Sequence, residues 1–255
     1  MSNYATYPSL RDRVVLITGG AAGIGAAMVT AFHAQGARVA FLDVDEEKAL
    51  GLIKTLSMTD ICDPYFLKCD VRDVQILKES ISNISNKVGK VHTLINNAGG
   101  TERLMANDIT LDKWENFQAL NLRHVLFASQ AVFDDMCAVG QGSIINFTSP
   151  TFRRRTKGWA GYAAAKSGIE GLSRILAREY GEAGIRVNSI MPGWTATEHH
   201  KEHFLTPEVE ADLMNVQCLK QFVLPEDIAR IALFLSADDS KFMTAQVYKG
   251  DAGLV

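Results

Sequence analysis

Short apolar runs alternate with longer amphipathic stretches along almost the whole chain. The apolar runs lie at 13–19, 37–44, 64–71, 91–99, 142–149, 185–193 and 245–253. Helical patterns lie between them, at 21–36, roughly 112–139, roughly 160–183 and 225–238 among others. This alternation is typical of parallel strands covered by helices on both faces. The sequence therefore predicts an α/β, doubly wound Rossmann fold, with one parallel sheet of about seven strands and helices on both faces.

The composition is that of one globular domain. The chain has 255 residues, of which 47% are apolar and 22% charged, so we expect a single domain over 1–255. A net charge of −3 favours neither nucleic acid nor an acidic membrane as a partner. No apolar run approaches the roughly 20 residues of a spanning helix, and the cysteines are scattered, as in reduced proteins. We expect a cytoplasmic location.

A glycine-rich loop follows the first predicted strand. It reads Thr18-Gly-Gly-Ala-Ala-Gly-Ile-Gly25 and opens the first helix. In a doubly wound sheet this loop lets the backbone approach a pyrophosphate, and the helix N-terminus offers N–H groups to the anion. The spacing is GxxxGxG without a following Lys-Ser/Thr, which argues against a triphosphate-binding P-loop. We expect a dinucleotide at Gly19, Gly23, Ile24 and Gly25; the alternative is a structural turn.

Asp43 ends the second predicted strand. A carboxylate there accepts hydrogen bonds from the ribose hydroxyls of NAD and repels the 2′-phosphate of NADP. No arginine or lysine stands in its place. The sequence therefore predicts NAD as the cofactor; a solvated strand end is the alternative.

Ser149, Tyr162 and Lys166 bear the side chains suited to alcohol oxidation. Tyr162 and Lys166 share one face of a helix because they are spaced i and i+4. A nearby cation lowers the pKa of a tyrosine, which could then take the proton of a substrate hydroxyl while hydride leaves the same carbon. Ser149 ends a strand and could hydrogen-bond the substrate oxygen. Each signal alone is weak, since YxxxK pairs and strand-end serines are common.

Taken in order, the motifs resemble the short-chain dehydrogenase/reductase family over nearly the whole chain. They are TGGAAGIG (18–25), Asp43, CDV (69–71), NNAG (96–99), Asn121, Ser149, Tyr162, Lys166 and PGWTAT (192–197). The resemblance implies that Asn121 joins the catalytic set as part of a proton relay, and that Lys166 also binds the nicotinamide ribose. It implies further cofactor contacts from Asp70, Val71, Asn97, Ala98, Gly99, Tyr162, Pro192, Gly193 and Thr195. It also implies a homotetramer or a dimer.

Further stretches, such as NLRH (121–124) and QCLK (217–220), resemble NAD(P)-dependent sugar 1-dehydrogenases of bacteria. That resemblance implies oxidation of the anomeric hydroxyl of an aldose to a lactone. The alternatives are a dehydrogenase of another secondary alcohol or a sugar acid, a 3-oxoacyl-type reductase, and a non-catalytic NAD-binding redox sensor. No GxSxG elbow supports a serine hydrolase at Ser149.

The segments around the predicted substrate entrance are less informative. The basic loop at 153–157 is either a solvated turn or a source of one arginine for the substrate, and Arg154 is our candidate. Segment 194–224 is mixed, broken by Pro207 and Pro225, and is expected to close over the substrate with Trp194 as an apolar wall. His199 and His203 are spaced i and i+4, but no carboxylate or cysteine completes a metal site. We expect no metal.

Overall fold

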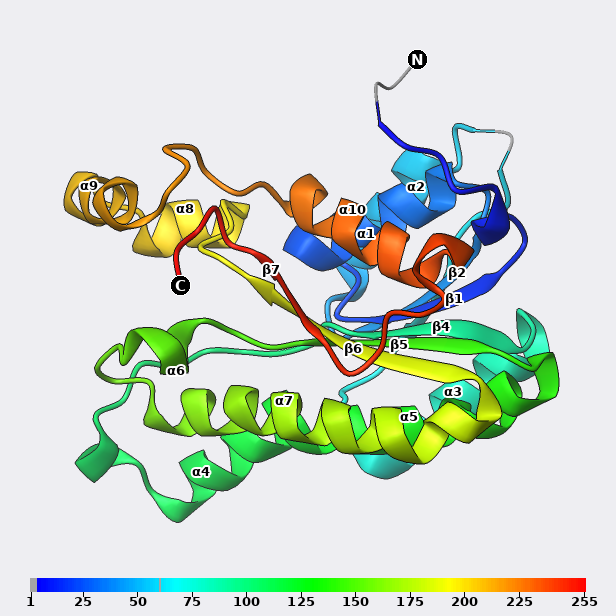
Figure 1. The fold of residues 1–255 in the computed structure, drawn as a ribbon, viewed down its shortest axis with the longest axis horizontal. Coiled ribbons are helices and arrows are strands. Elements are labelled where there is room, and N and C mark those ends of the chain that lie inside the picture. Colours follow the sequence, from blue (N-terminus) through cyan, green and yellow to red (C-terminus); the bar gives the residue numbers. More distant parts are fainter. Residues whose placement is uncertain (1–3, 60) are drawn as a thin grey trace.

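The computed structural model describes residues 4–59 and 61–255, without the side chains of 201, 203 and 204. Its core is one seven-stranded sheet in the order β3-β2-β1-β4-β5-β6-β7 (Figure 1). Every strand pair is parallel. The strands are β1 Val14–Thr18, β2 Arg38–Asp43, β3 Tyr65–Lys68, β4 Val91–Asn96, β5 Gly142–Phe147, β6 Ile185–Pro192 and β7 Val247–Gly250. The predicted doubly wound sheet is confirmed.

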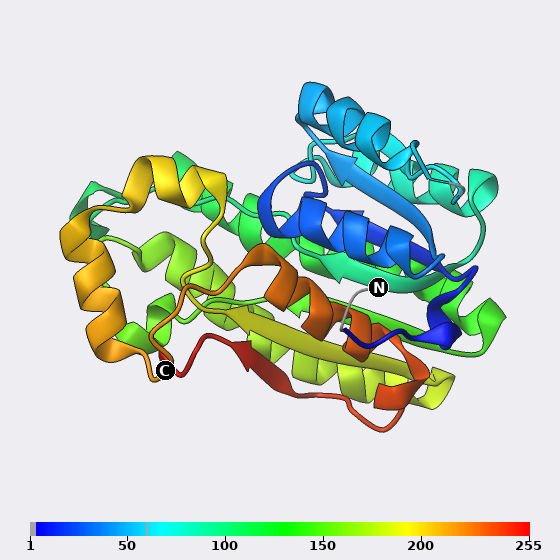
Figure 2. The same cartoon turned by 90° about the horizontal axis from the view of Figure 1, so that it is seen from above.

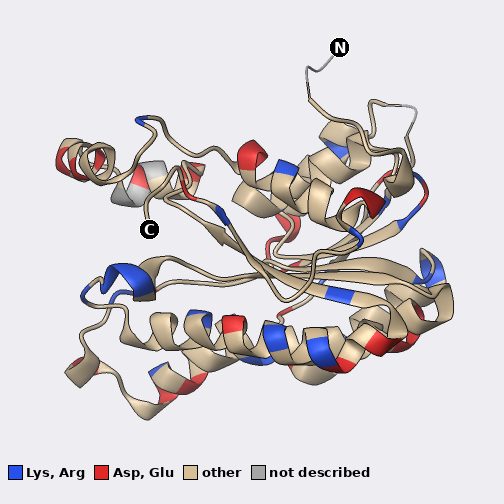
Figure 3. Cartoon of the chain, viewed as in Figure 1, with Lys and Arg blue, Asp and Glu red and all other residues tan. Residues whose placement is uncertain are grey.

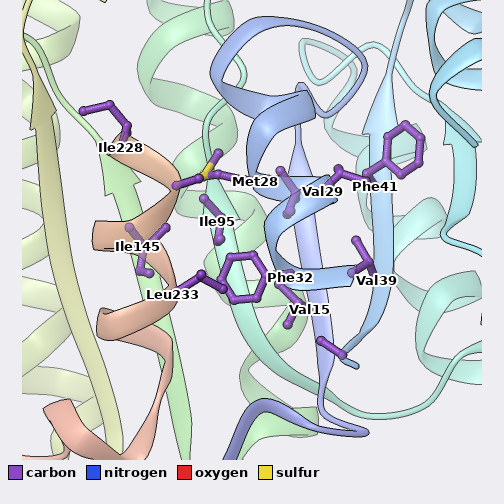
Figure 4. Packing of buried hydrophobic residues seen from close by; sticks show 14 of the residues in the cluster. Val15, Met28, Val29, Phe32, Val39, Phe41, Ile95, Ile145, Ile228 and Leu233 are labelled. Atoms are coloured by element: carbon purple, nitrogen blue, oxygen red, sulfur yellow. The ribbon is translucent and has the colours of Figure 1, made fainter. Parts of the chain in front are cut away.

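Helices cover both faces of the sheet, because its strands are apolar on both sides. On one face lie α1 Gly23–Ala34, α2 Glu46–Leu56 and α10 Pro225–Ser236, and on the other α3 Val74–Lys87, α5 His124–Val139 and α7 Ala160–Tyr180 (Figure 1). In β1, Val15 packs with α1 and α10 (Figure 4), and Ile17 belongs to the same cluster, whereas Val14 and Leu16 pack with the opposite helices. From Val14 to Ile17 both faces of β1 are apolar, as continuous apolar runs predict.

The predicted helix at 112–139 contains an irregularity. The structure has α4 Leu111–Gln118, then a π-turn at Ala119–Arg123, then α5. An i→i+5 turn inside a helix is uncommon and is frequent at functional sites. Here it includes Asn121, a residue of the predicted catalytic set.

Segment 194–224 contains two helices that the sequence pattern did not separate. α8 spans Glu198–Phe204 and α9 spans Pro207–Val216, and both project beyond the carboxyl ends of the strands (Figure 2). Thr197 and Thr206 cap them by accepting hydrogen bonds from the first-turn N–H groups of His200 and Val209. Pro207 and Pro225 each stand at the first turn of a helix, where proline is favoured. They therefore begin helices rather than break them.

A short helix, α6 Thr151–Arg154, lies in the basic loop after β5. Arg155 ends it with a left-handed backbone, at φ 54°. In Figure 1, α6 faces the α8–α9 projection across the end of the sheet. No helix in the described part of the chain is long and apolar enough to cross a membrane.

Candidate active site

The loop between β1 and α1 has the backbone that a dinucleotide cradle needs. Gly19 and Gly23 have φ of +67° and +54°, a region that glycine adopts without strain. A Cβ on Gly19 would stand 2.9 Å from the Cα of Ala98, and one on Gly25 would overlap the carbonyl of Gly19. No side chain caps the start of α1, which leaves its first N–H groups open to an anion. The loop therefore fits a pyrophosphate.

Asp43 joins this loop to β2. Its carboxylate accepts hydrogen bonds from the backbone N–H groups of Ala21 at 2.9 Å and Asp45 at 3.0 Å. The side chain is half-buried, so it lies beside the glycine loop with part of its surface in solvent. That position fits a carboxylate that binds ribose hydroxyls next to the phosphate cradle.

β1 and β4 are neighbours in the sheet, and their carboxyl ends are tied together by side chains. The hydroxyl of Thr18 accepts hydrogen bonds from the backbone N–H groups of Asn97 and Ala98, each at 3.1 Å. The side-chain amide of Asn97 donates in return to the carbonyl of Gly19 at 2.8 Å. This is the switch point of the sheet, where ligands of doubly wound folds bind. Asn97 and Ala98 thus lie next to the glycine loop, as expected of cofactor-binding residues.

Asp70 and Val71 follow β3 at the same edge. Asp70 accepts a hydrogen bond from the guanidinium of Arg72 at 3.0 Å, and this bond holds the pKa of the carboxyl below its usual range. Val71 is buried. Both follow the strand that pairs with β2, and Asp43 is paired with Lys68 just before them.

The side chain of Asn121 is hydrogen-bonded to the loop after β4. Its amide oxygen accepts from the N–H of Gly100 at 3.1 Å, and its amide nitrogen donates to the carbonyls of Gly100 and Phe117. A Cβ on Gly99 would stand 2.9 Å from the same oxygen. Asn121 therefore fixes the backbone at Gly100 and Phe117, and both its amide oxygen and its amide nitrogen are engaged in doing so.

Ser149, Tyr162 and Lys166 converge, although they come from two different elements. Ser149 follows β5, is 7% exposed, and shares a 2.8 Å hydrogen bond with the hydroxyl of Thr151. Tyr162 and Lys166 lie one turn apart on α7, and the ammonium is 5.8 Å from the centre of the tyrosine ring. That ammonium also donates to the carbonyl of Phe147 at 2.8 Å. The end of β5 therefore holds both the serine and the lysine.

Burial governs the electrostatics of this group. It lowers the pKa of Lys166 from 10.5 to about 8, so the amine is still mostly protonated at neutral pH. Burial also raises the pKa of Tyr162, and a hydrogen bond to Ser149 offsets part of that rise. The pKa of Tyr162 therefore lies above its ordinary value in the structure. From the sequence, Lys166 was expected to lower it.

The strand end of β6 supplies the remaining predicted cofactor contacts. The backbone N–H of Gly193 donates to Gly250 at 2.9 Å, and a Cβ on Gly193 would stand 2.6 Å from the Cα of Asp251. Thr195 is 1% exposed and forms an isolated bridge with Val223. Pro192 ends β6 beside them. This packing fixes the start of segment 194–224.

Two predicted substrate residues lie further out. Trp194 is half-buried and packs on Phe222 and His200, with ring centres 5.5 and 5.6 Å apart. Arg154 is exposed and makes no ion pair within the described residues, whereas Arg153 is bound to Glu170 at 2.7 Å. The side chain of His203 lies outside the described residues, so the expectation about metal stays a prediction.

Sequence reasoning missed two residues next to the catalytic group. Trp159 meets the ring of Tyr162 edge-on, with centres 5.7 Å apart. His124 is fully buried, and its Nε2 lies 3.1 Å from the carbonyl of Ala98. A histidine three residues after Asn121 was visible in the NLRH stretch, but a lone histidine at helical spacing carries no signal by itself.

A recess of about 1490 Å³ lies away from this group. It runs along the outer side of α1 against α2 and α10, and it reaches the glycine loop at Ala21, Ala22 and Gly23. Ser149, Tyr162 and Lys166 are not among its lining residues. We therefore locate the reaction at the convergent polar side chains and not in this recess.

The fold and this set of residues define a nicotinamide-dependent oxidoreductase of the Rossmann type. A family model described as enoyl-(acyl carrier protein) reductase matches residues 19–255. The chain is 40% identical to a probable galactose dehydrogenase of Rhizobium meliloti over 97% of each chain, and 40% identical to a D-xylose 1-dehydrogenase of Caulobacter vibrioides over 98% of each. The protein belongs to the short-chain dehydrogenase/reductase family and is a dehydrogenase that acts on CH–OH groups.

More distant relatives have other substrates in their names. A 3-oxoacyl-[acyl-carrier-protein] reductase of Thermotoga maritima is 33% identical over 96% of this chain and 99% of its own. The solved structure of a putative gluconate dehydrogenase from Agrobacterium tumefaciens superimposes with a TM-score of 0.92, at 26% identity and 98% coverage of both chains. The family is thus shared by proteins named for sugars, for a sugar acid and for acyl carriers.

Proposed function

We propose that the protein oxidises the anomeric hydroxyl of an aldose to a lactone with NAD. The observation that carries this proposal is the convergence of Ser149, Tyr162 and Lys166 beside the glycine loop, in a chain 40% identical to two named sugar dehydrogenases. When bound, the nicotinamide supplies a hydride acceptor. The cofactor would be held by the glycine loop, Asp43, Asp70, Val71, Asn97–Gly99 and Pro192–Thr195.

The chain's own residues handle the proton. Tyr162, as phenolate, accepts the proton of the anomeric hydroxyl while the C–H hydrogen leaves with both bonding electrons, so the carbon–oxygen double bond of the lactone forms. Ser149 donates a hydrogen bond to that oxygen. The ammonium of Lys166 stabilises the phenolate, which counteracts the effect of burial on the pKa of Tyr162. Asn121 holds the backbone that faces Lys166.

We assign NAD over NADP because of Asp43. Its carboxylate stands beside the glycine loop, bound to the N–H of Ala21, where it would repel a 2′-phosphate. The same feature disfavours the 3-oxoacyl reductase alternative as far as that activity uses NADPH. A non-catalytic redox sensor is disfavoured because the whole catalytic set is present and convergent.

A sugar acid is the second candidate substrate. Arg154 is exposed without an ion pair, and Arg155 and Lys157 stand beside it in the same loop. A guanidinium binds a carboxylate through parallel hydrogen bonds. We also propose that segment 194–224 closes over the substrate, that the molecule forms one domain, and that it works as a cytoplasmic homotetramer.

The test is NADH formation by the purified protein with NAD or NADP against aldoses, sugar acids and simple secondary alcohols. Turnover of a pentose or hexose with NAD supports the proposal, and the tolerated epimers show which hydroxyls the site recognises. Activity with a sugar acid and no activity with neutral sugars would replace the aldose by a sugar acid as the proposed substrate. Preference for NADPH and an acyl thioester refutes both.

A further inference from the structure

Among the described residues, His124 is the one buried titratable side chain beside the catalytic group to which the proposed mechanism gives no role. It is the first residue of α5, directly after the π-turn that contains Asn121. Its side chain is 0% exposed. Burial, reinforced by the positive charge of Lys166, lowers its pKa to about 3. The imidazole is therefore uncharged at neutral pH.

The one contact of the ring defines its tautomer. Nε2 lies 3.1 Å from the carbonyl oxygen of Ala98, and a carbonyl can only accept. A neutral imidazole has one donor and one acceptor nitrogen, so Nε2 carries the hydrogen and Nδ1 is bare. Nδ1 is buried and has no hydrogen-bond partner among the described residues.

The carbonyl that His124 binds belongs to the backbone beneath a cofactor. The N–H of Ala98 donates to Thr18 at 3.1 Å, and Gly100 is bound on both its N–H and its carbonyl by Asn121. The intervening Gly99 faces Lys166, since a Cβ placed on it would stand 3.4 Å from the ammonium nitrogen. The carbonyl of Ala98 belongs to the residue next to Gly99, and it is therefore a hydrogen-bond acceptor close to the ammonium of Lys166.

Resting on the proposed roles of Tyr162 and Lys166, we propose that His124 is a positioning residue. Its uncharged ring occupies the carbonyl of Ala98 and so keeps that carbonyl from drawing the Lys166 ammonium away from Tyr162. An ammonium binds a free buried carbonyl strongly, because the hydrogen bond is charge-assisted. A histidine can do this without adding a second positive charge next to Lys166.

Two substitutions separate this role from simple packing. His124→Gln keeps an uncharged N–H donor at similar reach, whereas His124→Leu keeps the volume and removes the donor. In the leucine variant the ammonium moves toward Ala98, so the apparent pKa of the catalytic base in the pH profile of kcat/KM rises. The value of kcat/KM at neutral pH falls about 10-fold, the equivalent of one hydrogen bond. The glutamine variant stays within about 3-fold of the wild type, with its pKa unshifted.

A packing role predicts a different pattern. Both variants would then lose thermal stability and activity together, with the pH profile of the wild type. An unshifted profile in His124→Leu, or a glutamine variant no better than the leucine one, overturns the proposal. If the leucine variant does not fold, His124→Met is measured in the same way.

The tautomer of His124 can also be measured on the wild-type protein, without an assay of enzyme activity. Nuclear magnetic resonance of protein labelled with 15N-histidine, with His124→Gln used for assignment, should show one ring that is uncharged and protonated on Nε2 from pH 8 down to pH 5. A ring that titrates in this range, or that carries its hydrogen on Nδ1, overturns the proposal. Full turnover by Tyr162→Phe would instead refute the proposed mechanism and leave this result standing.

Discussion

The catalytic edge of the sheet and the substrate rim, which we define as 150–159 and 194–216, differ in burial and in charge. At the edge, Ser149 and Lys166 are buried and hydrogen-bonded to residues at or beside the end of β5. At the rim the charges are exposed: basic on α6 and its loop, acidic on α8 and α9 (Figure 3). The buried edge keeps its atoms in place for one reaction. The exposed charges of the rim are free to meet a substrate from solvent.

The largest expected effect breaks the catalytic edge itself. Tyr162→Phe removes only the hydroxyl, so we expect turnover to fall about 10²–10⁴-fold, the usual contribution of a positioned general base. NAD affinity should stay nearly unchanged, because the phenyl ring still packs against Trp159. Steady-state kinetics and a cofactor titration measure the two quantities.

Tyr180→Phe is the matched control, since it removes a half-buried hydroxyl from the far end of the same helix. Its turnover should equal that of the wild type. A Tyr162→Phe enzyme with near-normal turnover would show that the edge does not use this tyrosine as its base.

The second prediction concerns the energy of burying the edge. Because burial lowers the pKa of Lys166 to about 8, below pH 8 both the folded and the unfolded chain hold the proton, and folding must desolvate the charge. Between pH 8 and 10.5 the folded protein has released a proton that the unfolded chain still binds, so stability rises with pH. Relative to Lys166→Met, the wild type should gain about 1–3 kcal/mol between pH 7 and pH 10.

Urea denaturation at several pH values measures this difference. The exposed Lys157 provides the control: a Lys157→Met variant should follow the wild type across the whole range. A gap between wild type and Lys166→Met that does not change with pH would mean that the amine is solvated in the folded protein.

The third prediction concerns Asp43 and the preference for NAD over NADP. Asp43→Asn removes the charge and keeps one oxygen acceptor, so we expect the preference for NAD over NADP to narrow about 10-fold, as for the loss of about 1.4 kcal/mol of repulsion. Ratios of kcat/KM for the two cofactors measure it. Asp45→Asn is the control, because Asp45 is two residues away and caps α2 through the N–H of Lys48. Equal effects of the two variants would mean that only net charge matters.

The same contrast explains what could be predicted from the sequence. The edge was predictable because Gly19, Asp43, Ser149 and Lys166 lie at strand ends or at helical spacing, which local rules locate. The π-turn around Asn121 was not, because the surrounding pattern indicates one continuous helix, and the contacts of its side chain with Gly100 are tertiary and leave no local pattern.

The rim was harder to predict for a related reason. From the sequence, Pro207 was interpreted as a break between elements. In the structure Thr206 caps α9, so the proline is a first-turn residue. The ion-pair partners of the arginines depend on where α7 lies, since Arg153 pairs with Glu170 on α7, seventeen residues further along the chain. No local rule separates Arg153 from Arg154.

The smallest expected effect tests whether the rim recognises charge. Arg154→Gln breaks no ion pair within the described residues, so the KM for a neutral aldose should change by less than about 2-fold. If the substrate is a sugar acid, the KM for that acid should rise about 10-fold, and the rise should shrink at high salt because the charges are exposed. Arg153→Gln is the matched control: its guanidinium is already bound to Glu170, so it should leave the KM of either substrate unchanged. An equal rise for neutral and acidic substrates would show that the rim acts through the shape of α6. Its charge would then have no part in recognition, and the sugar acid would lose the one structural feature that favours it.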